Sequence, residues 1–174
     1  MDKHPHFLWA DLFRRRRRTS DLVRILGENI LFATLKRREL GYLSSFVYER
    51  VFEPGEPIFR QGDRGVGMYL IASGRVGIRT QAVESAVFVT ELGEGSFLGE
   101  LALVDPQHLR SAHAVAIERS VLIGFFKPDL QEILDRNPAM GVKILFQLSS
   151  VLGRRLLETT DKITQMRSSH AKAA

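Results

Sequence analysis

The 174-residue chain contains no cysteine. This absence excludes disulfide bonds, thiolate zinc sites and cysteine nucleophiles together. The chain also lacks an apolar run of about 18 residues, the length at which a membrane-spanning helix becomes a candidate. Hydrophobic residues make up 44% of the sequence and charged residues 26%, a balance typical of one folded domain rather than of a disordered chain.

The excess of positive charge in this sequence comes from one short tract. Lysine and arginine number 25 against 20 acidic residues, and Arg14–Arg18 account for the whole difference of five. These charges follow the apolar residues 7–13 instead of preceding them, which is not the order of a secretory signal, so we expect a cytoplasmic protein. We expect residues 1–20 to be a solvated basic arm. Contact of the arginines with nucleic acid, an acidic partner or a membrane surface is the alternative.

The distribution of glycine and of apolar residues divides the rest of the chain into three parts. Apolar residues at helical spacing predict helices over 21–50, and helical spacing returns over 128–167, where Pro128 and Pro138 can open helices. Between them, ten of the 14 glycines lie from Gly55 to Gly124 among short β-branched runs, which predict strands. The expected strands include residues 68–71, 76–78, 87–89 and 112–117. We therefore predict an α+β fold: an antiparallel β-barrel or jelly roll with flanking helices, and a tail at 168–174.

The most informative stretch is residues 95–104, Gly-Ser-Phe-Leu-Gly-Glu-Leu-Ala-Leu-Val, followed by Arg110, Ser111 and Ala112. Gly99 lets the backbone pass close to a ligand, and the turn around Leu101 would point free amides at an anion. The Arg110 guanidinium can bind two phosphate oxygens and the Ser111 hydroxyl a third, while Glu100 can accept hydrogen bonds from sugar hydroxyls. A surface ion pair between Glu100 and Arg110 is the simpler interpretation, but the apolar neighbours of Glu100 favour a half-buried acid that needs partners. The pattern indicates a site for a phosphorylated sugar.

This stretch resembles the phosphate-binding cassette of cyclic nucleotide-binding domains. The resemblance extends over about residues 24–163: residues 31–40 resemble the opening helices of the family, and residues 55–63 and 68–76 its first strands. The ten-residue spacing from Glu100 to Arg110 and the sequence of residues 148–162 are most similar to the bacterial catabolite activator branch. Leu109 stands where many members have proline. No helix-turn-helix sequence follows the last helix, so we do not expect transcriptional activation.

The resemblance implies a role for each matching residue. Glu100 would bind the ribose 2′-hydroxyl, while Arg110 and Ser111 would hold the cyclic phosphate with the backbone of Gly99, Leu101 and Ala112. Arg155 matches an arginine that faces the cassette glutamate. Two further sets complete the expected site. One is the pair of hydroxyls of Thr159 and Thr160, which match the pair that meets adenine. The other is an apolar wall of Ile78, Val89 and Leu92, for which core packing alone is the favoured explanation, because any barrel needs such residues.

We therefore expect a stand-alone, non-catalytic receptor for a cyclic nucleotide, cAMP rather than cGMP, that acts on an effector protein which the sequence does not identify. An interaction module of the same fold with an empty pocket or another ligand is the alternative. An enzyme is disfavoured because phosphodiester hydrolysis would require metal ligands that the sequence lacks. A heptad pattern predicts a homodimer through the last helix; its positions are Leu145, Ser149, Leu152, Leu156, Thr159, Ile163 and Met166.

Overall fold

Two four-stranded antiparallel sheets form the centre of the computed structural model, which describes residues 19–80, 90–105, 107 and 109–173. Residues 1–18 of the predicted arm, with Arg14–Arg18, and the predicted strand 87–89, with Val89, lie outside the described residues, whereas Thr19 and Ser20 of that arm are helical. In the first sheet the order is β1 (Val47–Phe52), β8 (Ser120–Phe126), β3 (Gly67–Ser73) and β6 (Phe97–Leu98). In the second sheet it is β2 (Pro57–Phe59), β7 (His113–Ala116), β4 (Val76–Arg79) and β5 (Thr90–Leu92).

The sheets form the two layers of a jelly roll, as predicted, but they do not close into a barrel. Within the described residues, β1 and β6 are the edges of one sheet, and β2 and β5 are the edges of the other. Closure requires a hydrogen-bonded ladder that continues around the whole structure. Strands β5 and β6 have only three and two residues, which is too short to carry such a ladder across the gap.

Alternation along the central strands explains why the first sheet is buried on both faces. On β3, Met68 and Leu70 face the helical layer, while Tyr69 and Ile71 pack between the two sheets. On β8, Leu122 belongs to the core between the sheets, while its neighbours face the helices. The period of two therefore separates two apolar cores, one on each side of the first sheet.

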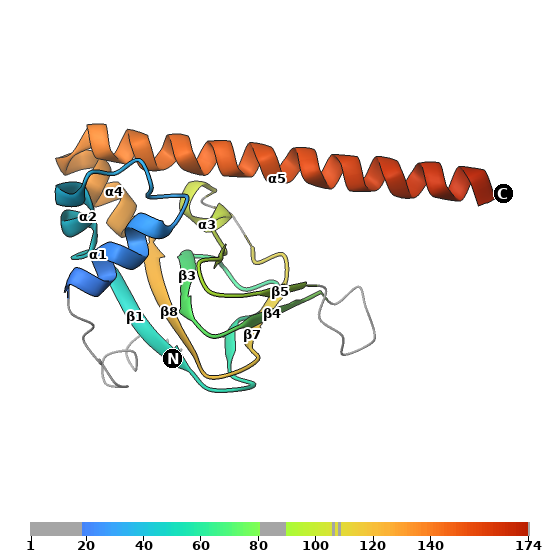
Figure 1. Cartoon of the computed structure of the whole chain (residues 1–174), viewed down its shortest axis with the longest axis horizontal. Coiled ribbons are helices and arrows are strands. Elements are labelled where there is room, and N and C mark those ends of the chain that lie inside the picture. Colours follow the sequence, from blue (N-terminus) through green and yellow to red (C-terminus); the bar gives the residue numbers. More distant parts are fainter. Residues whose placement is uncertain (1–18, 81–89, 106, 108, 174) are drawn as a thin grey trace, which may run out of the picture.

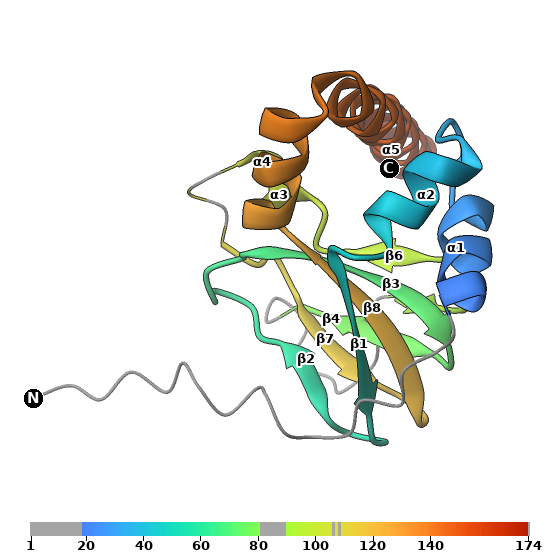
Figure 2. The same ribbon diagram turned by 90° about the vertical axis from the view of Figure 1, so that its left-hand side faces the viewer.

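Helices cover the outer face of the first sheet (Figure 2). These are α1 (Thr19–Glu28), α2 (Arg37–Leu43), α4 (Lys127–Arg136) and α5 (Pro138–Ala173), and the short α3 (Leu101–Val104) lies at the end of β6. Pro128 lies in the first turn of α4 and Pro138 begins α5, which confirms the predicted helix starts.

Helix α5 belongs to the core along only part of its length. Met140, Ile144, Leu148 and Val151 are buried against the first sheet and the other helices. Past this segment the helix continues beyond the sheets and runs through residues 168–173, which were predicted to be a tail (Figure 1). Its last described side chains are exposed, so nothing in the described part of the chain covers the apolar ones among them.

Candidate functional site

The segment that resembles the cassette, residues 95–112 (here called the cassette), contains β6 and makes a tight turn where that strand ends. Gly99 has a φ of 76°, in the left-handed region that favours glycine. The amides of Ala102 and Leu103 donate to the carbonyls of Gly99 and Glu100 at 3.2 and 3.0 Å, which closes the single turn of α3. Ala102 and Leu103 are buried and fix this turn against the sheet. The predicted helical turn after Gly99 is confirmed.

Arg110 is a buried cation, with 5% of its surface exposed. Its guanidinium donates to the carbonyl of Gly99 at 3.0 Å and to that of Gly67 at 2.7 Å. Its Cζ atom lies 4.2 Å from the centre of the Phe59 ring. Burial lowers the pKa of Arg110, and the nearby groups of Tyr69, Glu100 and Asp63 oppose that shift. An arginine nevertheless stays protonated at neutral pH, so the site holds a fixed positive charge.

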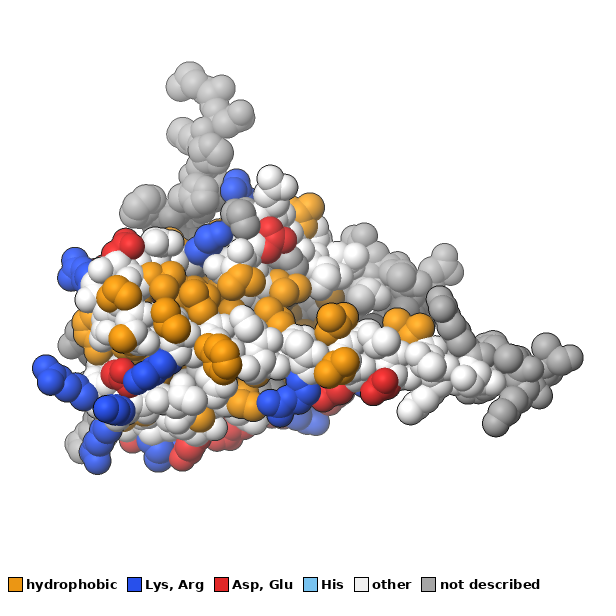
Figure 3. Space-filling model, turned by 90° about the horizontal axis from the view of Figure 1, so that it is seen from above, with side chains coloured by type: hydrophobic (Ala, Val, Ile, Leu, Met, Phe, Trp, Pro, Cys, Tyr) orange, Lys and Arg blue, Asp and Glu red, His pale blue; other side chains and the backbone are white. Residues whose placement is uncertain are grey.

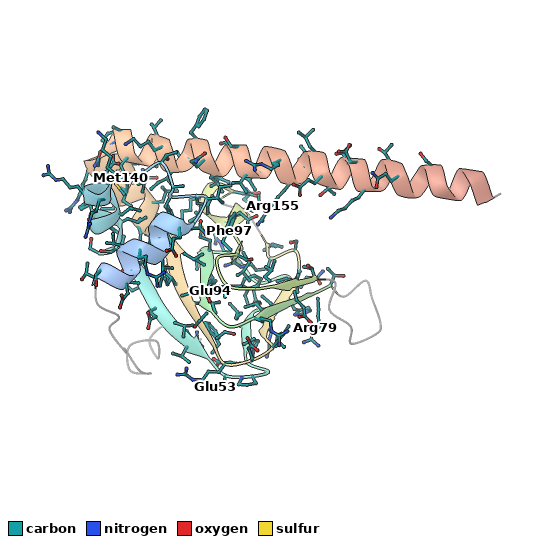
Figure 4. The ribbon with its side chains drawn as sticks, viewed as in Figure 1. Glu53, Arg79, Glu94, Phe97, Met140 and Arg155 are labelled. Carbon is teal, nitrogen blue, oxygen red and sulfur yellow. The ribbon has the colours of Figure 1, made fainter. Side chains whose placement is uncertain are left out.

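Glu100 is the second buried charge of the cassette, with 7% of its surface exposed. Its Oε1 accepts a hydrogen bond of 2.5 Å from Arg155 on α5. The Arg155 guanidinium also lies 4.6 Å from the centre of the Phe97 ring and donates to the Phe97 carbonyl at 3.4 Å. Figure 4 shows Arg155 and Phe97 close together beneath α5. A half-exposed cation from the long helix therefore compensates the buried carboxylate.

The structure gathers Gly99, Glu100, Arg110 and Arg155 into one connected group. Ser111 is exposed, Ala112 is half-buried and Leu101 is 38% exposed, so none of these three is enclosed by the core.

Thr159 and Thr160 lie about one turn beyond Arg155, on the exposed part of α5, and are not brought against the cassette. On the strands, Ile78 and Leu92 pack against the core between the sheets, as the packing interpretation expects.

The sequence did not predict three residues that contact the charged side chains. The Phe59 ring and the Gly67 carbonyl contact Arg110, and the ring of Phe97 contacts Arg155. Phe59 and Gly67 are the first and last residues of the run Phe-Arg-Gln-Gly-Asp-Arg-Gly-Val-Gly, of which residues 59–63 resemble only a strand of the family and residues 64–67 carry no predicted role. No local sequence pattern indicates that this run contacts the side chain of Arg110, which lies more than 40 positions later.

Within the residues that the structure describes, no group of three or more histidine, cysteine, aspartate or glutamate side chains is arranged to hold a metal ion. None of the helices in that part of the chain combines the length and apolar character needed to cross a membrane.

A family model for the cyclic nucleotide-binding domain matches residues 49–137, which include the cassette and the strands around it. The chain belongs to this family, as the resemblance of the cassette indicated. In the structure, that match begins in β1 and ends after α4.

Among individual proteins, the cyclic AMP receptor protein of Thermus thermophilus is 36% identical over 129 residues, 74% of this chain and 57% of that protein. The cAMP-dependent protein kinase type II regulatory subunit of Drosophila melanogaster is 33% identical over 97 residues, 56% of this chain and 25% of that protein. The chain thus spans little more than half of the first relative and a quarter of the second.

Solved structures agree with these matches. A cyclic nucleotide-binding domain from Methylobacillus flagellatus superposes with a TM-score of 0.72 and 25% identity, over 84% of this chain and 82% of that one. The Thermus thermophilus catabolite activator protein superposes with a TM-score of 0.70 and 33% identity, over 79% of this chain and 63% of that one.

Proposed function

We propose that this chain is a non-catalytic receptor for a cyclic nucleotide, bound at the cassette, with cAMP preferred to cGMP. The observation that carries the proposal is the pair of buried opposite charges at the Gly99 turn: Glu100 follows Gly99 in the turn, and the Arg110 side chain donates to the Gly99 carbonyl. Burying two charges is costly unless each has partners, and a site for a phosphorylated sugar uses both signs. Two of the relatives, named as a cyclic AMP receptor protein and a regulatory subunit of a cAMP-dependent protein kinase, support the same ligand class.

The phosphate would bind at Arg110. The guanidinium has five N–H donors, of which the carbonyls of Gly99 and Gly67 use two. The remaining donors, together with the exposed Ser111 hydroxyl, can bind the oxygens of a cyclic phosphate. Glu100 would accept the ribose 2′-hydroxyl beside the hydrogen bond that it already accepts from Arg155.

The preference for adenine is argued from the hydroxyls of Thr159 and Thr160. Each donates its proton to its own helix, to the carbonyls of Arg155 and Leu156 at 2.7 and 2.9 Å. In this state each oxygen offers only lone pairs, which suit the exocyclic amine of adenine and not the carbonyl of guanine. For a base to reach these residues, the ligand must extend from the cassette towards α5.

We also propose that the chain forms a homodimer through α5. The outward face of the helix carries exposed apolar side chains, at Val142, Phe146, Leu156, Leu157 and Ile163. Figure 3 looks onto this face and shows hydrophobic side chains along it. A second copy of the same helix suits this face, because residues along it recur at heptad spacing. The heptad positions are Val142, Phe146, Ser149, Gly153, Leu156, Thr160 and Ile163.

This register differs from the predicted heptad seam. Leu145 and Leu152 were predicted to face a partner, but both are partly buried against the core of their own domain. Met166 lies among the side chains that the structure does not describe. The exposed seam is therefore rotated about the helix axis away from Leu145 and Leu152. Gly153 lies on it, and a Cβ there would meet nothing within 4 Å, so a partner helix could approach closely.

Calorimetric titration of the purified chain tests the receptor proposal. We expect saturable binding of cAMP, weaker binding of cGMP, and weaker binding still of 5′-AMP, which has the same base but no cyclic phosphate. Equal affinity for cAMP and 5′-AMP would contradict a site shaped for the cyclic phosphate. Absence of binding to all three would favour an interaction module with an empty pocket or another ligand.

A further inference from the structure

The connection from β2 to β3, residues 59–67, surrounds Arg110. The Arg110 amide donates to the Asp63 carbonyl at 2.8 Å, and the Gly62 amide donates to the Arg110 carbonyl at 2.9 Å. At the other end of the residue, the guanidinium donates to the Gly67 carbonyl and lies over the Phe59 ring. One nine-residue segment therefore fixes both the backbone and the side chain of Arg110, although it lies outside the cassette.

Two glycines in this segment lie where a larger side chain would collide with its neighbours. A Cβ on Gly65 would lie 3.3 Å from the Arg110 Cζ and 2.8 Å from the Ala102 Cβ. A Cβ on Gly67 would lie 2.5 Å from the Phe125 carbonyl oxygen, because β3 is pressed against β8 at this point. The Gly67 carbonyl is thus held by the sheet and cannot follow the guanidinium if the latter moves.

We propose that Phe59 is a positioning residue for Arg110: its ring holds the buried guanidinium at the angle at which the remaining N–H donors meet a phosphate. This inference rests on the proposed function. Phe59 ends β2 and pairs with Ala114 on β7, so its ring is fixed by the second sheet while the carbonyl partners of Arg110 lie on the first sheet and in the cassette turn. The stack therefore joins the two sheets at the phosphate site.

The physical reason is that a desolvated guanidinium is attracted to an aromatic face more strongly than an exposed one. Without the ring, Arg110 would keep its two carbonyl partners but could rotate and tilt about them. A phosphate would then have to order the side chain on binding, which lowers affinity without removing any direct contact with the ligand.

The test compares two variants of Phe59 with a matched control. Phe59→Leu removes the aromatic face, and we expect its affinity for cAMP to fall about tenfold. Phe59→Tyr keeps the face and should bind within about threefold of the wild type. Phe126→Leu is the control, because the Phe126 ring packs in the same aromatic cluster against Tyr69 but its described ring contacts include no arginine. It should bind cAMP like the wild type, and thermal unfolding should show that all three variants fold.

A double-mutant cycle separates positioning from general packing. In an Arg110→Lys background, where the planar guanidinium is gone, Phe59→Leu should change cAMP affinity less than about twofold. A purely structural role for Phe59 would lower affinity equally in both backgrounds, and that result would overturn the proposal. Equal affinity of Phe59→Leu and the wild type would overturn it as well.

A nuclear magnetic resonance measurement on the ligand-free chain distinguishes failure of this inference from failure of the proposed function. The Nε proton of Arg110, assigned by its loss in Arg110→Lys, should resonate upfield because the guanidinium lies over the Phe59 ring, and should move downfield in Phe59→Leu but not in Phe126→Leu. An unchanged position in Phe59→Leu would overturn the stack whether or not the chain binds cAMP. If the wild type binds no cyclic nucleotide, the receptor proposal is wrong. The proposed role of Phe59 in phosphate binding is then wrong too, even if the resonance shows that the ring lies on Arg110.

Discussion

Arg155 on α5 and Glu100 in the cassette turn are joined by a 2.5 Å hydrogen bond between oppositely charged groups that lie 55 residues apart in the sequence. The contact attaches the long helix directly to the carboxylate that we propose for the ribose. Because the same helix carries the proposed dimer seam, a change in the geometry of Glu100 can be transmitted to the seam. This arrangement would link ligand binding to the dimer contact.

Arg155→Ala should weaken that attachment. Glu100 would remain buried without its cation, and since Arg155 itself is about half exposed we expect a loss of about 1 kcal/mol in the free energy of unfolding. The cAMP affinity should also fall, because Glu100 is no longer held in one orientation. Chemical denaturation and calorimetry measure the two effects. Arg154→Ala, at the exposed neighbouring position, is the control, and an equal response of both variants would argue against the attachment.

Gly99→Ala should damage the site in a way that an equivalent glycine does not. Gly99 and Gly95 have φ values of 76° and 79°, so alanine at either position carries a similar backbone strain of about 1–2 kcal/mol. A Cβ at Gly95 would meet nothing within 4 Å, whereas a Cβ at Gly99 would collide with the Arg110 guanidinium. Both variants should therefore unfold at lower temperature, but only Gly99→Ala should also lose cAMP affinity. A similar loss in Gly95→Ala would show that strain alone, and not displacement of Arg110, is responsible.

Thr159→Val with Thr160→Val should reduce the discrimination between cAMP and cGMP. Each valine keeps the shape of threonine but removes an acceptor for the adenine amine, which corresponds to about 1 kcal/mol, or about fivefold in cAMP affinity for each hydrogen bond. The affinity for cGMP should change little. Thr164→Val is the control, because the Thr164 hydroxyl donates to the helix in the same way one turn further along. A wild type that binds cGMP at least as tightly as cAMP would refute the adenine assignment.

Leu156→Asp with Ile163→Asp should convert the proposed dimer into monomers. Both side chains are exposed on the seam, at 67% and 43%, so the substitutions should leave the fold of each chain intact. Sedimentation velocity measures the outcome. Arg154→Asp with Lys162→Asp places the same charges on other faces of the helix and should leave a dimer. If the Leu156 and Ile163 variant still sediments as a dimer, α5 is not the interface.

Local sequence patterns were sufficient to predict several parts of this structure. The helix starts at Pro128 and Pro138, the turn at Gly99 and the charged residues of the cassette all depend on near neighbours in the sequence. The open edges of the two sheets, the burial of Leu145 and the stack of Phe59 on Arg110 depend on how distant segments pack. A heptad pattern, for example, indicates an apolar stripe on α5 but cannot show which side of that stripe the domain itself covers.

The most direct test of the account is a cAMP titration of Arg110→Ala beside Arg64→Ala. Arg110 is buried and holds the fixed charge of the proposed phosphate site, whereas Arg64 is exposed on the loop next to it. Loss of a buried charge partner costs about 2–5 kcal/mol, so Arg110→Ala should bind cAMP about 30- to 5,000-fold more weakly than the wild type. Arg64→Ala should bind within about threefold of the wild type. A folded Arg110→Ala variant that binds cAMP as tightly as the wild type would contradict the assignment of the cassette as the nucleotide site.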